Sequence, residues 1–172
     1  LLESSIPEDP MNLFNRWFHE VEDFDEAGEV NAMTVSTIGL DGFPKLRIVL
    51  LKKFNEEGFI FFTNYNSEKG RAIANNPKIC LSFFWESLER QVIIKGIAQK
   101  TSENISDGYF ESRPDGSKLG AIVSNQSEVI TSRNFLEESL KQLEKDFEGK
   151  EIPRPMHWGG FLVNPLEVEF WQ

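Results

Sequence analysis

The residues best suited to chemistry in this chain are cations at the ends of predicted strands and the starts of predicted helices. Arg47 opens an apolar run that continues to Leu51, and Lys52 closes it. On a regular strand, residues five positions apart point to opposite faces and lie ~17 Å apart along the backbone. The two cations would therefore serve two anions better than one. A buried strand whose long basic side chains reach solvent at both ends explains the same pattern without a ligand.

Two further groups of residues have the chemistry to bind phosphate. Ser67, Glu68 and Lys69 begin a predicted helix, where unpaired N–H groups and the helix dipole favour an anion. Tyr109 and Arg113 are four positions apart, which puts them on one face of a helix. Each group also has an ordinary structural explanation, a helix cap in the first case and an exposed cation beside an aromatic ring in the second. Taken singly, none of these signals identifies a ligand.

The common motifs for other kinds of site do not occur in the sequence. It contains no GxGxxG, P-loop, CxxC or HExxH pattern. The two histidines, His19 and His157, form no compelling serine–histidine–aspartate arrangement, and we interpret both as structural residues. We therefore expect no metal site, and we assign no catalytic side chain.

Composition and charge limit the classes of protein that this chain can be. The formal net charge is −10, which argues against a broad basic surface for nucleic acid. No apolar run approaches the ~20 residues of a membrane helix, so we expect a soluble protein with no membrane contact. The first residues lack the pattern of a secretory signal. The single cysteine, Cys80, cannot form an internal disulfide, and together these features predict a cytoplasmic protein.

Apolar and turn patterns predict a mainly β fold with α additions, in a single domain of residues 1–172. Asp9 and Pro10 begin an N-terminal helix of about residues 10–24. An Asp-Gly pair at 41–42 predicts a hairpin between the first two strands. Strands are expected at 32–38, 45–53, 59–64, 79–85, 90–100 and 160–171, the last interrupted or turned at Asn164-Pro165. Further helices are expected at 68–75, from a Ser102 cap to Arg113-Pro114, at 117–123 and at 132–147. Six or so antiparallel strands with peripheral helices favour a small β-barrel.

Short sequence words in a fixed order carry a resemblance to a known family. They are RIVLLK (47–52), FFTN (61–64), SEKG (67–70), ERQV (89–92), YFESRP (109–114), GSKLGA (116–121), SNQS (124–127), WGG (158–160) and EFWQ (169–172). In this order they resemble the pyridoxamine 5′-phosphate oxidases, which are FMN enzymes of the split-barrel fold. The resemblance covers nearly the whole chain, and although each word is weak, the collinear series is specific.

The resemblance implies a cofactor, a substrate and a set of site residues. FMN would lie between two subunits of a homodimer, with Arg47, Lys69 and Ser127 at its phosphate or ribityl chain. Around its ring and tail would lie Ile48, Val49, Leu50, Phe62, Thr63, Gln91, Gln126 and Trp171. The phosphate of a vitamin B6 substrate would be held by Lys52, Tyr109, Arg113 and Ser117. The implied reaction oxidises pyridoxamine or pyridoxine 5′-phosphate to pyridoxal 5′-phosphate, with dioxygen as acceptor and hydrogen peroxide as product.

Two features of the chain differ from the family pattern. Relatives commonly have a basic residue where this chain has Glu68, whose charge would repel a phosphate, and Arg71 could compensate. Relatives also continue beyond EFWQ, so we expect the C-terminal family segment to be missing after residue 172. These differences keep a non-catalytic FMN- or pyridoxal-phosphate-binding split-barrel protein open as the alternative. A flavin oxidase for another ring system, as in phenazine synthesis, and a module without a ligand are the remaining alternatives.

Overall fold

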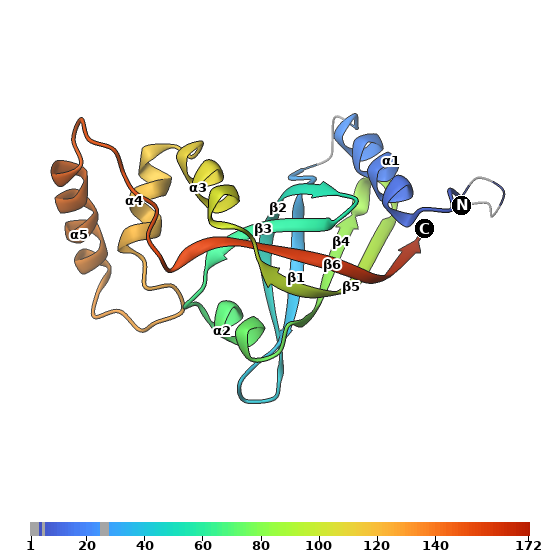
Figure 1. The fold of residues 1–172 in the computed structure, drawn as a ribbon, viewed down its shortest axis with the longest axis horizontal. Coiled ribbons are helices and arrows are strands. Elements are labelled where there is room, and N and C mark those ends of the chain that lie inside the picture. The colour runs from blue at the N-terminus through green and yellow to red at the C-terminus, as the bar shows by residue number, and fades with distance from the viewer. Residues whose placement is uncertain (1–3, 5, 25–27) are drawn as a thin grey trace.

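The centre of the molecule is a closed antiparallel barrel. The computed structural model describes residues 4, 6–24 and 28–172, and within them six strands pair in the order β1-β2-β3-β6-β5-β4 (Figure 1). The strands are β1 (Ala32–Ile38), β2 (Pro44–Asn55), β3 (Gly58–Asn64), β4 (Lys78–Trp85), β5 (Arg90–Lys100) and β6 (Trp158–Trp171). The predicted mainly β fold with peripheral helices is confirmed.

The helices lie around the barrel and at its two ends. They are α1 (Pro10–Glu22), α2 (Glu68–Asn75), α3 (Glu103–Glu111), α4 (Asp115–Val123) and α5 (Arg133–Asp146), and a short 3₁₀ turn spans Glu86–Leu88. Figure 1 shows α3, α4 and α5 grouped at one end of the molecule, while α1 lies at the opposite end. None of these helices is long and apolar enough to cross a membrane within the residues described.

Helix α1 closes one end of the barrel with aromatic side chains. Phe14 is fully buried, and its ring meets Phe54, Phe59 and Phe83 at centroid distances of 5.0, 4.9 and 5.1 Å. The edge-on angles of these pairs are those that aromatic quadrupoles favour. Asp9 fixes the start of the helix, because its carboxylate accepts a hydrogen bond from the Met11 amide at 2.8 Å. The main core of the protein therefore extends from α1 into the barrel.

A second, smaller core lies under α3, α4 and α5. Its buried members are Phe110, Leu119, Ile152 and Trp158. Trp158 is also the first residue of β6, so this cluster joins the helices to the barrel at the end of a strand. The candidate site described below lies at this junction.

Several predicted boundaries differ from the structure, most clearly at the ends of two helices. The N-terminal helix ends at Glu22 rather than near residue 24, because Asp23 caps it through its own amide. Helix α3 ends at Glu111, before the predicted Arg113-Pro114, since a residue that precedes proline is disfavoured in a helix. Ser102 does occupy the N-cap position of α3, but its side chain makes no capping hydrogen bond.

The last strand continues through the predicted interruption. β6 runs unbroken from Trp158 to Trp171, and Pro165 pairs with Gly96 where the register with β5 shifts. A proline has no amide to donate, and an irregularity of this kind is where a sheet accommodates one. Asn164-Pro165 therefore marks a bulge and not a turn.

Replacing Phe14 by alanine should strongly destabilise the protein. The change removes a fully buried ring that contacts three others, and such truncations cost about 3–5 kcal/mol in free energy of unfolding. Chemical denaturation followed by tryptophan fluorescence measures the loss. Phe135→Ala is the matched control, because this ring is exposed on α5, and its effect should stay within about 0.5 kcal/mol. Equal effects of the two changes would contradict the assignment of Phe14 to the core.

Candidate functional site

The start of α2 directs the side chain of one lysine into the protein. Ser67 caps the helix by accepting a hydrogen bond from the Gly70 amide at 3.2 Å. A Cβ atom at position 70 would lie 2.2 Å from the Tyr65 carbonyl oxygen, so only glycine allows the helix to pack this closely against the end of β3. Lys69, which precedes this glycine, is held at the same close approach and is 7% exposed.

The Lys69 amine is surrounded by neutral oxygen atoms. Its Nζ lies 2.8 Å from Gln126 Oε1, 3.2 Å from Thr63 Oγ1 and 3.4 Å from Ser67 Oγ. No carboxylate among the described residues forms an ion pair with it. Burial lowers the pKa of Lys69, and the nearby Arg47 cation lowers it further. The Glu68 carboxylate, which forms no ion pair with Lys69, partly offsets these effects on its pKa. The group is thus a desolvated cation with hydrogen-bond partners but no ion pair.

A second cation lies against a stack of aromatic rings. Phe62 and Tyr109 stack at a centroid distance of 4.0 Å, and Trp158 lies 5.5 Å from Phe62 with its ring nearly parallel. The Arg113 guanidinium sits 4.6 Å above the centre of the Trp158 ring, a cation–π geometry. Its Nη1 is buried without a hydrogen-bond partner among the described residues, and burial lowers the pKa of the side chain. Arg113 therefore has donor capacity that the protein leaves unused.

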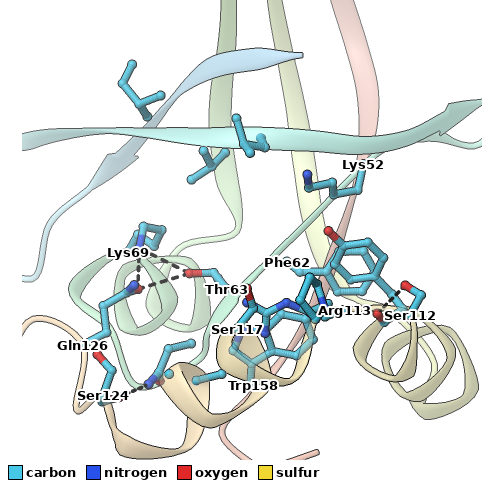
Figure 2. Close-up of a pocket in the computed structure, with 18 residues that line it drawn as sticks. Lys52, Phe62, Thr63, Lys69, Ser112, Arg113, Ser117, Ser124, Gln126 and Trp158 are labelled. Atoms are coloured by element: carbon cyan, nitrogen blue, oxygen red, sulfur yellow. Dashed lines mark hydrogen bonds between the residues drawn. The ribbon is translucent and has the colours of Figure 1, made fainter. Parts of the chain in front are cut away.

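Both cations line one cavity of about 750 Å³. Figure 2 shows Lys69 and Gln126 on one side of it and Lys52 and Arg113 on the other, with Phe62 between them. The lining comes from β2, β3, α2, α3, α4, β6 and the connections between them: Ile48, Val49, Leu50, Lys52, Phe62, Thr63, Asn64, Lys69, Tyr109, Ser112, Arg113, Pro114, Ser117, Gly120, Ala121, Ser124, Gln126 and Trp158. Lys69 at one side and Lys52 with Arg113 at the other can bind two anions, or one ligand with anionic ends.

The cavity brings together most of the residues singled out from the sequence. From the predicted cofactor set it contains Ile48, Val49, Leu50, Phe62, Thr63, Lys69 and Gln126. From the predicted substrate set it contains Lys52, Tyr109, Arg113 and Ser117. Arg113 reaches it from just beyond α3 because its amide still bonds to the Phe110 carbonyl, which continues the last turn. A register shift between β2 and β3 occurs at Lys52, the cation that lines the cavity from β2.

Four predicted residues lie outside the cavity lining. Arg47 is half exposed, and its Nη2 lies 2.6 Å from Glu68 Oε2. Gln91 on β5 pairs with Trp171 on β6, and Trp171 is 59% exposed. Ser127 adopts a positive φ of 71° in the segment after α4. Within one chain, none of these four residues lines the cavity with the other predicted site residues.

Glu68 is the centre of a small charge network on the rim of α2. Besides Arg47, its carboxylate lies 3.5 Å from the Lys45 amine, which in turn lies 2.7 Å from Asp41. The hydrogen bond from Lys45 lowers the pKa of Asp41. Arg71, the residue expected to compensate for Glu68, is exposed and lies outside the cavity lining. Glu68 therefore holds Arg47 in an internal ion pair.

Sequence reasoning missed several residues of the site. Trp158 supplies the surface on which Arg113 rests, and Asn64 ties the end of β3 to the end of α4 by donating to the Ser124 carbonyl at 3.2 Å. Ser112, Pro114, Gly120 and Ala121 complete the wall. Trp158, Asn64 and Ser124 belong to the words WGG, FFTN and SNQS, which was the available signal. Their roles depend on stacking and on tertiary hydrogen bonds, which spacing does not reveal.

The chain matches known proteins over its whole length. The family model described as "Pyridoxamine 5′-phosphate oxidase" matches residues 19–145. Proteins named pyridoxine/pyridoxamine 5′-phosphate oxidase from Flavobacterium johnsoniae and Christiangramia forsetii are 80% and 54% identical to it over 172 residues. In both cases the match covers all of this chain and 80% of the relative.

Solved structures of two other proteins share the fold. PhzG from Burkholderia lata, solved in complex with tetrahydrophenazine-1-carboxylic acid, is 26% identical with a TM-score of 0.92, covering 99% of this chain and 84% of that one. A pyridoxamine 5′-phosphate oxidase-related, FMN-binding protein from Nostoc punctiforme is 14% identical with a TM-score of 0.71, covering 96% and 86%, and supports the fold alone. The match of the family model to most of the chain, together with the full-length relatives, shows that this chain belongs to the pyridoxamine 5′-phosphate oxidase family.

Proposed function

We propose that this chain is an FMN-dependent oxidase that converts pyridoxamine and pyridoxine 5′-phosphate to pyridoxal 5′-phosphate. The observation that carries the proposal is a cavity with positive charge at two separated sides, Lys69 at one and Lys52 with Arg113 at the other. The Lys69 side would hold the phosphate end of FMN, and the other side would hold the phosphate of the vitamin B6 substrate. The names of the relatives support the same substrate class.

The Lys69 side of the cavity fits the anionic end of FMN. A buried ammonium group without a counter-charge costs free energy, and a bound phosphate would offset that cost. Thr63 and Gln126 already contact the amine and could turn their own polar groups to the cofactor. Ile48, Val49, Leu50 and Phe62 would contact its ring and tail. Arg47 would contact the phosphate or ribityl chain of FMN once its ion pair with Glu68 is broken.

The Arg113 side fits the phosphate of the substrate. The guanidinium rests on Trp158 with an unused buried N–H group, and it is a planar fork suited to phosphate oxygens. Lys52 would add a second positive charge from β2, and the hydroxyls of Ser117 and Tyr109 would add hydrogen bonds. This set would fix the end of the substrate remote from the reacting carbon, so that binding energy orients that carbon.

The chemistry that FMN supplies when bound is two-electron oxidation of the substrate carbon, with dioxygen as final acceptor and hydrogen peroxide as product. The chain itself supplies position and electrostatics. The stacked rings of Phe62, Tyr109 and Trp158 would give the cavity an apolar side against which a planar ring can pack. The two cation sets hold the anions at opposite sides of the cavity. No side chain needs to act as nucleophile or acid–base catalyst in this scheme.

A second copy of the chain would complete the site. Leu46 and Ile48 on β2 and Phe84 on β4 are 58%, 70% and 64% exposed and share the outer face of the barrel, with β1 between the two strands. Several large apolar side chains exposed on one face are typical of an interaction surface. Ile48 also lines the cavity, so the cavity borders this apolar face. Gln91 pairs with Phe84, and Trp171 pairs with Gln91, which places them in the same outward row. In a homodimer, such a row would reach the partner's cavity.

Two alternative functions would require the cavity to bind other ligands. An oxidase for another ring system is suggested by the likeness to PhzG, whose ligand carries a carboxylic acid and not a phosphate. A non-catalytic flavin-binding protein would need only the Lys69 side. Four residues at the other side, Lys52, Tyr109, Arg113 and Ser117, favour a phosphorylated substrate over both. Inhibition by inorganic phosphate, competitive with substrate, separates the proposal from either alternative.

The purified chain should be a dimer. Sedimentation velocity should give twice the 19.8 kDa mass of one chain. Leu46→Arg should shift the protein toward the monomer and weaken FMN binding, because it places a charge in the apolar face. The exposed Phe135→Arg on α5 is the control and should leave the mass unchanged. A wild-type monomer that binds FMN fully would contradict the shared site.

Arg113→Ala should separate substrate binding from cofactor binding. Wild-type protein loaded with FMN should convert pyridoxamine 5′-phosphate, dioxygen and water to pyridoxal 5′-phosphate, ammonia and hydrogen peroxide in equal amounts. Loss of a charge-assisted phosphate contact should raise the KM of the variant about 10- to 100-fold while its FMN content stays close to wild type. Arg133→Ala on α5 is the control, because its side chain is 89% exposed. Loss of FMN in the Arg113 variant would mean that this residue belongs to the other half of the site.

Glu68→Gln should strengthen FMN binding. The change removes a negative charge beside the proposed phosphate position and frees Arg47 from its ion pair. The dissociation constant of FMN should fall about 5-fold at low salt, with a smaller effect at high salt. Riboflavin, which lacks the phosphate, should bind both proteins equally, and Glu137→Gln on α5 should change neither constant. An equal gain for riboflavin would contradict an effect through the phosphate.

A further inference from the structure

One indole ring sets the geometry of the substrate half of the cavity. Phe62 and Tyr109 lie nearly parallel to Trp158, with interplanar angles of 12° and 8° to it. Arg113 rests on the same ring, and its buried Nη1 has no hydrogen bond to hold it among the described residues. The direction of this guanidinium therefore follows the position of Trp158.

Arg154 links Trp158 to the helix that carries Tyr109. Its Nη1 donates to the Trp158 carbonyl at 2.7 Å, and its Nε donates to the Asp107 carboxylate at 2.6 Å. The Arg154 side chain is only 9% exposed, although it precedes β6 in a loop. Asp107 belongs to α3. One planar guanidinium with fixed donor directions thus spans from α3 to the first residue of β6.

Other contacts also join α3 to β6. Ser106 Oγ accepts from the Gly160 amide at 3.1 Å, and the amide of Thr101, just before the helix, donates to the Gly160 carbonyl at 2.9 Å. The Phe110 ring on α3 packs edge-on against Trp158 at a centroid distance of 5.2 Å. Arg154 adds to these a charge-assisted link between Asp107 and the Trp158 carbonyl. Arg154 does not line the cavity, so its action on a ligand does not involve direct contact.

We propose that Arg154 is a positioning residue that fixes α3 against Trp158 and thereby sets the affinity of the cavity for a phosphorylated ligand. The inference rests on the proposed function for the identity of that ligand, a vitamin B6 phosphate. It assigns Asp107 as the partner through which Arg154 acts on Tyr109 and Arg113. The two contacts are charge-assisted, so their loss is expected to be measurable.

The test uses Arg154→Met, Asp107→Asn and the double variant, all loaded with FMN. Two quantities are measured: the KM for pyridoxamine 5′-phosphate, and the dissociation constant of pyridoxal 5′-phosphate by calorimetric titration, which needs no turnover. Arg154→Met should raise both about 10-fold, with kcat and the FMN dissociation constant changed by less than about 2-fold. Asp107→Asn, a mild change at a half-exposed residue, should raise both about 3-fold. The double variant should show the same KM and the same dissociation constant as Arg154→Met, because both changes break the same link.

The control is Arg133→Met, which breaks an arginine–glutamate pair of similar geometry on exposed α5 and should change neither quantity. Unchanged ligand affinity in Arg154→Met and Asp107→Asn would overturn the inference. A parallel fall of kcat, FMN affinity and melting temperature would also overturn it, because that pattern indicates general destabilisation. A wild-type protein that binds pyridoxal 5′-phosphate without turnover would reject the oxidase, while the variants still decide the role of Arg154. If the wild-type protein neither oxidises pyridoxamine 5′-phosphate nor binds pyridoxal 5′-phosphate, both proposals are contradicted.

Discussion

The burial of positive charge without matching negative charge is the constraint on which the site depends. Lys69 is held among neutral oxygens, and Arg113 is held on an indole ring, and in both cases burial works against the charged form. The chain as a whole has a net charge of −10, so these cations are a local exception. A protein can afford such groups where a ligand supplies the missing anion. Lys69 and Arg113 line the same cavity of about 750 Å³, so one bound ligand or a pair of ligands can reach both.

The residues of the site are held by two parts of the molecule, the barrel and the smaller core beside it. The barrel, closed at one end by α1, fixes β2 and β3 and with them Lys52, Phe62 and Thr63. The smaller core beneath α3, α4 and α5 fixes Tyr109, Arg113 and Ser117. Trp158 belongs to both halves, because it begins β6 and also lies in the smaller core. The distance between the Lys69 side and the Arg113 side of the cavity therefore depends on how firmly this residue is held.

Local signals were enough to predict much of the fold. The Asp9-Pro10 start, the Asp-Gly hairpin and the alternating strands gave the correct elements, and β1, α2 and β5 have the predicted bounds. Errors arose where tertiary contacts decide the outcome. Pro165 stays in β6 because a bulge against β5 accommodates it, and Arg113 faces the cavity from outside the helix that was expected to carry it.

The candidate site was predictable mainly through the collinear family words. Spacing alone suggested that Arg47 and Lys52 serve different anions, and only Lys52 faces the cavity in a single chain. Glu68 was recognised as an unusual charge, but its ion pair with Arg47 depends on a contact between residues 21 positions apart. Arg154 carried no sequence signal, because its role arises from one hydrogen bond to a carbonyl and one to a helix.

The proposed oxidase requires that the cavity hold a flavin and a vitamin B6 phosphate together, in contact that allows oxidation. The most direct test is anaerobic mixing of the FMN-loaded protein with pyridoxamine 5′-phosphate, followed through the visible absorbance of the flavin. We expect the flavin absorbance to bleach on mixing and to recover when air is admitted, and pyridoxal 5′-phosphate to form. A bound flavin that stays oxidised while the substrate saturates its site would contradict this proposal.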